Sequence, residues 1–387
     1  MPVRHIVAIP SWYGSGRGPG GGYFRDQALA LQQAGFRVAI LAPEIHTWRD
    51  LREGRAPAAR RGHATIEDDG IPTWRRSRLV VVPRLPYRNA LAWARGGLGL
   101  FRQYVAEHGL PDLVHAHSVL NAGVVALAIK RRYRVPFVLT EHSTGFAQQR
   151  LRWWERDLVR RVVAAAYRCI AVSPDLARLL EGQFPGSRWH YLPNPLGEAF
   201  VADPEPPAGK PAKSPFVFLS AARMSPEKGF GLLIDAFTEA FGGNPETRLR
   251  LAGDGPIRSD LERRCAQRGI AGQVDFLGDL PSPRVREEMV AADAFVLASD
   301  VESFGVVVIE ALACGRPVVV TKSGGPDHIV NPRNGMLIPI RDRAALRDAL
   351  RVMRRRAGEY DSTAIRADAL SLYGPDAFTR RFAEIVG

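Results

Sequence analysis

Short apolar segments alternate with longer amphipathic segments along most of the chain. Ile6–Pro10 has the length and composition of a buried strand, and Tyr23–Ala34 after it has helical spacing. This alternation predicts a parallel sheet covered by helices. Further strands are predicted at Val38–Leu41, Leu113–His115, Phe137–Thr140 and Cys169–Val172, and further helices at Leu120–Arg131, Leu151–Ala166 and Asp175–Glu181.

A proline-rich segment, residues 203–215, interrupts the alternation and is typical of a linker between domains. A second alternating series follows it, with strands predicted at Val217–Ala221, Arg248–Ala252, Val274–Leu277, Ala294–Ala298 and Pro317–Val320. The pattern therefore predicts two doubly wound, Rossmann-like α/β domains, residues 1–200 and 201–374. Such sheets bind ligands at the carboxyl ends of their strands, so two facing domains form a cleft.

The composition is that of an ordinary globular protein. The 387 residues are 46% hydrophobic and 24% charged, which suits two domains that each bury a core. The three cysteines are far apart and form no C-x-x-C pair, so no disulfide framework or metal site is expected. The N-terminus lacks a leader pattern, and no apolar run approaches the roughly 20 residues of a membrane span. We expect a cytoplasmic protein, or a peripheral one at the inner face of a membrane.

The net charge of +13 is confined to the first half of the chain. Residues 1–200 contain 28 basic and 15 acidic residues, whereas residues 201–387 contain 25 of each. Solvated arginines are the plainest interpretation; an anionic membrane or a phosphorylated acceptor is the functional one. Nucleic acid is not expected, because no helix-turn-helix, zinc or base-stacking signature accompanies the charge.

Two glutamates, Glu302 and Glu310, stand on either side of a Phe-Gly turn, where the pattern changes from strand to helix. The helix is predicted over Val306–Ala313, because Gly315 and Pro317 end it. Both acids can face a ligand at the helix N-terminus, a position that favours phosphate. Two acids at arbitrary spacing are more often a solvated loop acid and a helix-surface acid, so the interpretation depends on their surroundings.

Two cations precede this element. Arg223 and Lys228 follow the first strand of the second series, and a helix is predicted from Gly229. At the end of a strand both side chains can reach a diphosphate in the cleft, the arginine as a planar fork and the lysine as a point charge. An isolated pair of this kind is usually a pair of surface cations.

Together these motifs resemble the family 4 retaining glycosyltransferases of the GT-B fold. The resemblance rests on E-x7-E at Glu302–Glu310, R-x4-K-G at Arg223–Gly229, and G-x-P-V-V from Gly315 followed by a Gly-Gly loop. It implies that the last helix, a candidate at Pro375–Val386, crosses back to the first domain, so that residues 375–387 belong with residues 1–200. It also implies that the first domain receives the acceptor and the second binds the donor.

The resemblance assigns roles to the matching residues. Glu310 is expected to hold the ribose hydroxyls, and Glu302 the hydroxyls of the sugar. Backbone N–H groups of three further residues should assist, those of Ser303, Phe304 and Gly305. Arg223 and Lys228 are expected to neutralise the donor diphosphate, which is done by a metal in other transferases, so no metal and no cofactor are expected.

In the first domain the resemblance singles out a histidine and two glycines. His142, just past a predicted strand, matches a histidine that contacts the donor sugar, although a strand-end histidine without such a context is usually structural. Gly21 and Gly22 close a glycine-rich loop whose N–H groups approach the donor phosphates. The loop formally contains G-x-G-x-x-G, but it starts well after the strand and no ribose-binding acid follows, so NAD is not expected.

Two other features of the first domain have simpler interpretations. His115 and His117 end a predicted strand and are candidates for the acceptor side, on position alone. The acidic cluster at residues 67–69 precedes Gly70 and is most simply a turn between two strands.

The expected reaction is transfer of a hexose from a nucleotide diphosphate sugar to an acceptor hydroxyl, with retention at the anomeric carbon. UDP is favoured over GDP as the nucleotide. The charge distribution favours an acceptor in envelope polysaccharide or lipid-linked glycan synthesis. The alternatives are a small soluble natural-product acceptor, a catalytically inactive nucleotide-sugar binding protein, and a GT-B epimerase or phosphorylase.

Overall fold

The computed structural model describes residues 3–13, 22–47, 63–68, 70–80, 87–148, 151–202 and 215–387. The chain forms two compact units, one of residues 1–195 with 375–387 and one of residues 196–374. The boundary predicted from the sequence, after residue 200, lies close to this division. Within the described ranges, no helix combines the length and the apolar composition that a membrane crossing requires.

The first unit is built on an eight-stranded sheet in the order β3-β4-β2-β1-β5-β6-β7-β8. All neighbouring strands are parallel except β3 and β4, so the expectation of a parallel sheet is confirmed apart from this antiparallel edge. The strands are β1 His5–Pro10, β2 Arg37–Thr47, β3 His63–Asp68, β4 Ile71–Val80, β5 Leu113–His117, β6 Phe137–Glu141, β7 Arg168–Ala171 and β8 Trp189–Tyr191.

Two features of this sheet bear on the sequence predictions. β3 and β4 form a hairpin, so two strands meet at this point as predicted, but Glu67 and Asp68 belong to β3 and not to the turn, and Asp69 lies outside the described residues. β2 runs well past the predicted end at Leu41, because β4 pairs with it as far as Thr47 and Val80. The partner strand, which comes from a distant part of the sequence, sets the length of β2.

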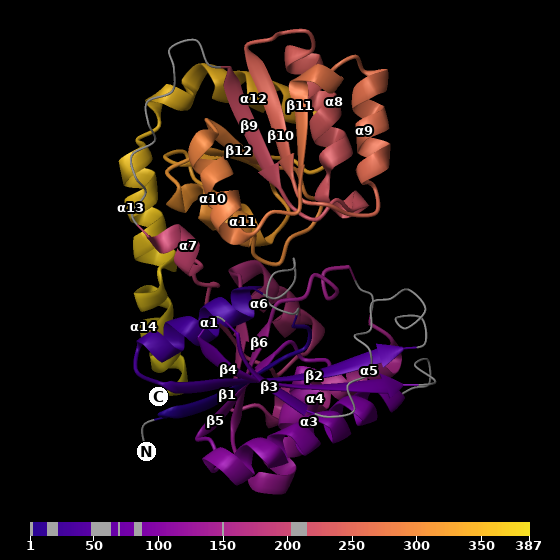
Figure 1. Cartoon of the computed structure of the whole chain (residues 1–387), viewed down its shortest axis with the longest axis vertical. Helices are drawn as coiled ribbons and strands as arrows, with labels where there is room; N and C mark the ends of the chain where they lie inside the picture. The colour runs from indigo at the N-terminus through magenta and orange to yellow at the C-terminus, as the bar shows by residue number, and fades with distance from the viewer. Residues whose placement is uncertain are drawn as a thin grey trace. The chain divides into compact units, whose positions relative to one another are not determined.

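Helices cover both faces of the first sheet (Figure 1). They are α1 Gly22–Gln33, α3 Arg88–His108, α4 Ala122–Tyr133, α5 Trp153–Ala165, α6 Pro174–Gln183 and the C-terminal α14 Pro375–Val386. The core joins strand residues such as Ile6 and Ile40 to Leu31 of α1 and to Phe378 and Phe382 of α14. The last helix therefore packs in the first unit, as the resemblance implies.

The second unit has a parallel six-stranded sheet in the order β11-β10-β9-β12-β13-β14. The connection reverses direction between β9 and β12, the arrangement of a doubly wound nucleotide-binding domain. The predicted fold class is thus confirmed. The strands are β9 Phe216–Ala221, β10 Thr247–Ala252, β11 Val274–Gly278, β12 Ala294–Leu297, β13 Val318–Thr321 and β14 Gly335–Ile338.

The helices of the second unit also lie on both sides of their sheet (Figure 1). They are α7 Glu198–Val201, α8 Phe230–Phe241, α9 Arg258–Gln267, α10 Ser282–Ala291, α11 Val306–Ala313, α12 Arg343–Arg356 and α13 Ser362–Tyr373. The helix predicted over Val306–Ala313 is confirmed residue for residue. The core is apolar and rich in phenylalanine, with Phe218, Phe230 and Phe237 almost fully buried.

Candidate functional site

The predicted donor residues of the second unit lie at the point where its sheet reverses direction. β9 and β12 are neighbours, so the turns that follow them emerge side by side at the carboxyl edge of the sheet. The turn after β9 carries Arg223 and Lys228, and the turn after β12 carries Glu302. This is the edge at which sheets of this type bind their ligands.

Lys228 and Glu302 form an ion pair in this turn region. Nζ of Lys228 lies 2.7 Å from Oε1 of Glu302, and the hydroxyl of Ser299 donates to the same oxygen at 2.7 Å. The lysine side chain is 23% exposed and the glutamate side chain 11%, so the pair is largely shielded from water. Among the described residues, Oε2 of Glu302 has no hydrogen-bond donor. The pair therefore holds the glutamate in place while one carboxylate oxygen stays free to accept from a ligand.

Close backbone packing fixes the turn that carries the cations. Gly229 adopts a left-handed conformation with φ +70°, and a Cβ there would lie 2.0 Å from the carbonyl oxygen of Ala298. Only glycine allows this approach of the two turns. The neighbouring residue Met224 donates its N–H to the carbonyl of Asp254 at 2.8 Å. Arg223, which directly precedes Met224, is exposed at the strand end.

The N-terminus of α11 is held by the loop that follows β13. Glu302 donates its N–H to Ser323, and Gly325 donates to the carbonyl of Glu302. A Cβ at Gly325 would lie 2.3 Å from the nitrogen of Phe304, so the Gly-Gly loop must be made of glycine to pack here. Gly305 caps the helix with φ +95° and provides no side-chain cap. The first N–H groups of α11 have no partner inside the helix and favour an anion.

The remaining predicted residues of this unit surround the same turn. Ser303 is half-buried, the side chain of Phe304 is 1% exposed and anchors the turn, and Glu310 is half-buried in the second turn of α11. The structure thus brings Lys228 and Glu302 into direct contact and places Arg223, Ser303 and Gly305 on the turns that carry them. The roles of these residues remain predictions.

In the first unit, His142 belongs to a buried cluster. Its Nε2 lies 3.1 Å from Nδ1 of His117, and the rings of Tyr23 and Phe24 lie about 5 Å from it. His142 is 6% exposed, and its Nδ1 has no partner among the described residues. A buried nitrogen without a partner is costly, so this atom is a candidate contact for a ligand.

Burial determines the charge of these histidines. It lowers the pKa of His115 to about 3 and holds the pKa values of His117 and His142 well below their usual range, with neighbouring histidines adding to the effect. All three are therefore neutral at pH 7. His115 is 1% exposed, its Nε2 lies 2.7 Å from the Thr140 hydroxyl, and its ring lies near Phe382. It is a core residue and does not line an open surface.

Glu141 is a buried acid for which the sequence predicted no role. It is fully buried, and its carboxylate accepts backbone N–H groups from Val119, His142 and Ser143 at 2.7–2.9 Å. Burial raises its pKa, while these hydrogen bonds oppose the rise. Both oxygens are occupied, so this carboxylate organises the backbone around His142. A strand-end acid before the histidine was the only signal in the sequence.

The glycine loop is only partly covered by the structure. Gly21 lies outside the described residues, and Gly22 is the exposed first residue of α1. A Cβ at Gly22 would meet none of the described residues within 4 Å, so their packing does not require glycine there. Among the described residues, no group of three or more histidine, cysteine or acidic side chains is placed to hold a metal ion.

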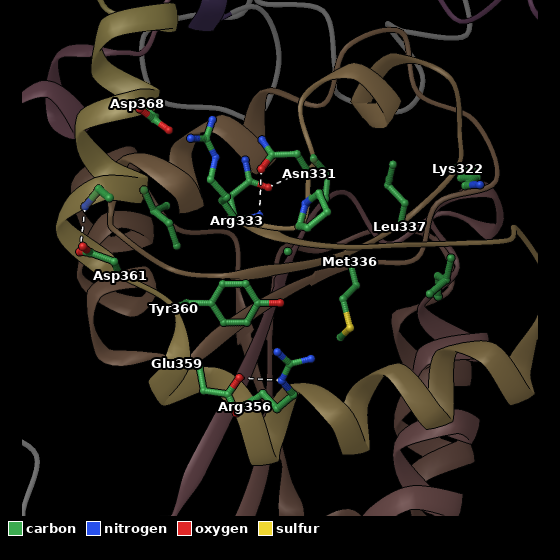
Figure 2. A pocket seen from close by; sticks show the side chains of 17 residues that line it. Lys322, Asn331, Arg333, Met336, Leu337, Arg356, Glu359, Tyr360, Asp361 and Asp368 are labelled. Atoms are coloured by element: carbon green, nitrogen blue, oxygen red, sulfur yellow. Dashed lines mark hydrogen bonds and ion pairs between the residues drawn. The ribbon is translucent and has the colours of Figure 1, made fainter.

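The second unit also has a cavity of about 940 Å³ away from these turns. It lies beside the edge strand β14 and the connection between α12 and α13, with Tyr360 and Met336 extending into it (Figure 2). None of the described residues that were predicted to bind the donor lines it. This cavity is therefore not the predicted donor site.

Two family models together cover most of the chain. Residues 203–359 match the model described as glycosyl transferases group 1, and residues 20–197 match the model described as glycosyltransferase family 4. The two models divide near the proline-rich segment that was predicted to be a linker.

Curated relatives and solved structures agree with these models. TuaC of Bacillus subtilis (strain 168), whose proposed role is that of a teichuronic acid biosynthesis glycosyltransferase, is 28% identical over 89% of this chain and 88% of its own length. The D-inositol 3-phosphate glycosyltransferase of Frankia alni is 32% identical over 63% of this chain and 66% of that protein. Other curated relatives are matched over as little as 50% of their length. HepE of Anabaena, solved with UDP-glucose, covers 99% of both chains with a TM-score of 0.71 at 20% identity, which shows a shared fold.

Proposed function

Since the chain belongs to the family 4 glycosyltransferases, we propose that it transfers a hexose from a nucleotide diphosphate sugar to an acceptor hydroxyl with retention at the anomeric carbon. The observation that carries the proposal is the contact between Lys228 and Glu302 at 2.7 Å, beside the N-terminus of α11. A diphosphate at that helix end would meet N–H groups and two cations, and the attached sugar would meet Glu302.

The residues have distinct roles in this proposal. Arg223 and Lys228 stabilise the charge that develops on the departing diphosphate, the electrostatic effect that usually dominates such reactions. Glu302 accepts hydrogen bonds from the sugar hydroxyls, and Glu310 accepts them from the ribose. Glu141 is fully buried and its carboxylate binds backbone N–H groups, so it is not placed to act as the nucleophile that retention often uses. The departing phosphate accepts the proton of the acceptor hydroxyl, so no enzymatic base is required.

We favour UDP as the nucleotide. HepE, a structural neighbour of this chain, was solved with UDP and with UDP-glucose. A panel of UDP and GDP in a thermal shift assay tests the choice, because a ligand at 100 times its dissociation constant stabilises the folded state by about 2.7 kcal/mol. Stabilisation by GDP alone would reverse the preference.

Substitutions of the two glutamates should have different effects on UDP binding and on turnover. Glu310→Ala is expected to weaken UDP binding by about 1.5–3 kcal/mol, because the ribose loses a charged hydrogen-bond partner. Glu302→Ala should leave UDP affinity close to that of the parent and reduce turnover with the sugar donor. Titration calorimetry with UDP and a turnover assay measure the two effects. If both variants bound UDP like the parent, the assignment of Glu310 to the ribose would be wrong.

We further propose that the acceptor is an envelope glycan or a lipid-linked glycan presented at an anionic membrane. The excess of arginine in residues 1–200 supports this proposal, since each cation near such a surface contributes roughly 1 kcal/mol. Arg152 and Arg156, at the start of α5, belong to that excess, as does Arg150 outside the described residues. The positive potential of these arginines would not strengthen the binding of a small soluble acceptor.

Vesicle sedimentation tests the membrane proposal. The parent should bind phosphatidylglycerol vesicles at low salt, bind less at high salt, and not bind neutral vesicles. Charge reversal at Arg150, Arg152 and Arg156 should weaken binding, whereas reversal at three exposed arginines of the second unit should not. Absence of binding even at low ionic strength would favour the soluble acceptor.

A further inference from the structure

A second hollow lies in the first unit, where strands β7 and β8 begin. It has a volume of about 750 Å³ and is lined by the last turns of α5, the start of β7 and the loop that leads from Phe184 into β8. The histidine cluster lies at the carboxyl ends of strands β5 and β6 in the same sheet. This hollow, at the amino ends, is therefore a separate place on the molecule.

The charged side chains that line the hollow are all basic. Three arginines, Arg160, Arg168 and Arg188, line it together with His190, and among the described residues no aspartate or glutamate does. Within the described part of the chain, none of the three arginines has a carboxylate within ion-pair distance, although Arg161 and Arg178 nearby are paired. Clustered arginines are usually paired with acidic side chains, because unscreened like charges repel one another.

The register of the two strands explains why the cations gather. Cys169 pairs with Trp189 and Ile170 with His190, so Arg168 and Arg188 precede a matched pair on adjacent parallel strands. Side chains two residues apart point to the same face, which places His190 with Arg188. Burial and then Arg188 and Arg168 lower the pKa of His190, while the nearby Glu181 carboxylate opposes the shift.

One of the arginines is already oriented. The guanidinium of Arg168 lies 4.3 Å from the centre of the Tyr167 ring, and its Nη1 donates to the Tyr167 carbonyl at 3.0 Å. A fixed guanidinium loses little freedom when it binds, and its fork matches the oxygens of a phosphoryl group. Arg160 and Arg188 are exposed and free to close on such a ligand.

We propose that this hollow is an anion site that binds a phosphoryl group. The shared chemistry is a multiply charged phosphate, which is present both in free phosphate or diphosphate and in the headgroup of an anionic lipid. The site is independent of the proposed donor site, because it lies in the other unit and uses none of the donor residues.

Titration calorimetry with inorganic pyrophosphate tests the site on the full chain. The proposed donor site also binds pyrophosphate, so Lys228→Ala is used to separate the two. The pocket variant is Arg168→Ala with Arg188→Ala. Its matched control is Arg131→Ala with Arg132→Ala, which removes the same charge from exposed positions at the end of α4. Arg188→Glu, at an exposed position, is a second pocket variant if the double variant folds poorly.

Pyrophosphate binding should persist in Lys228→Ala, weaken at least tenfold in the pocket variant and be unchanged in the control. Sedimentation with phosphatidylglycerol vesicles distinguishes the sources. If vesicle binding weakens in the pocket variant, the ligand is a lipid headgroup. If pyrophosphate binding weakens in this variant but vesicle binding does not, the ligand is a soluble phosphate. If neither probe depends on these two arginines, the site does not exist.

Discussion

Lys228→Ala and Arg223→Ala are each expected to reduce turnover at least about 100-fold, because each removes a cation that stabilises charge on the departing diphosphate. Arg355→Ala, a change at an exposed arginine of the same unit, should have no effect and is the matched control. Steady-state turnover with the sugar donor, combined with a melting curve of each variant, measures the effect. The melting curve matters for Lys228, since its loss leaves Glu302 partly buried without its cation.

The same account predicts that EDTA has little effect on turnover, since the two side chains do the work of a metal ion. Lys228→Arg should retain part of the activity, because it preserves the charge but not the shape of the ammonium group. Full inhibition by EDTA that manganese or magnesium restores would contradict the mechanism.

Acid is expected to destabilise the first unit strongly. Its buried histidines have folded-state pKa values below the unfolded value near 6.5, so the unfolded chain binds more protons and stability falls as the pH drops below that value. At pH 5 each histidine that stays neutral in the folded state lowers the free energy of unfolding by about 2 kcal/mol. The raised pKa of Glu141 acts with the opposite sign, because its carboxyl gains a proton in the folded state first. One acid offsets only part of the effect of three histidines.

Tryptophan fluorescence reports the unfolding of the first unit, because all seven tryptophans lie in residues 1–195. Urea unfolding at pH 7.5 and pH 5.0 should show a much lower midpoint at pH 5.0. His115→Gln, which removes one titrating group beside Thr140, should reduce the difference in unfolding free energy between the two pH values by about 2 kcal/mol. Equal midpoints for the parent at both pH values would show that the histidines are not held neutral.

The local sequence predicted the elements well where the pattern itself determines them. Val306–Ala313 is bounded by glycine and proline signals, and the structure reproduces it. The length of β2 and the antiparallel position of β3 were not predictable, because they depend on pairing with β4. Which strand pairs with which depends on the whole sheet, so the residues of one strand carry little information about its partner.

The candidate site was likewise predictable from local sequence only in part. The motifs indicated Lys228 and Glu302 separately, but their contact joins residues 74 positions apart and depends on β9 lying beside β12. Similarly, His117 and His142 meet because β5 and β6 pair in parallel, with His117 opposite Thr140. Glu141 had no motif to reveal it, since its role is to bind backbone N–H groups of residues brought together by that pairing.

The most direct test of the central claim is the fate of a nucleotide sugar without acceptor. Incubation with UDP-hexoses in the presence of EDTA should release UDP slowly. Proton NMR of the first sugar formed should show the same anomeric configuration as the donor, and Lys228→Ala should abolish the release. Release of a sugar with inverted configuration, or no release with any UDP- or GDP-hexose in the presence or absence of an acceptor glycan, would contradict the account.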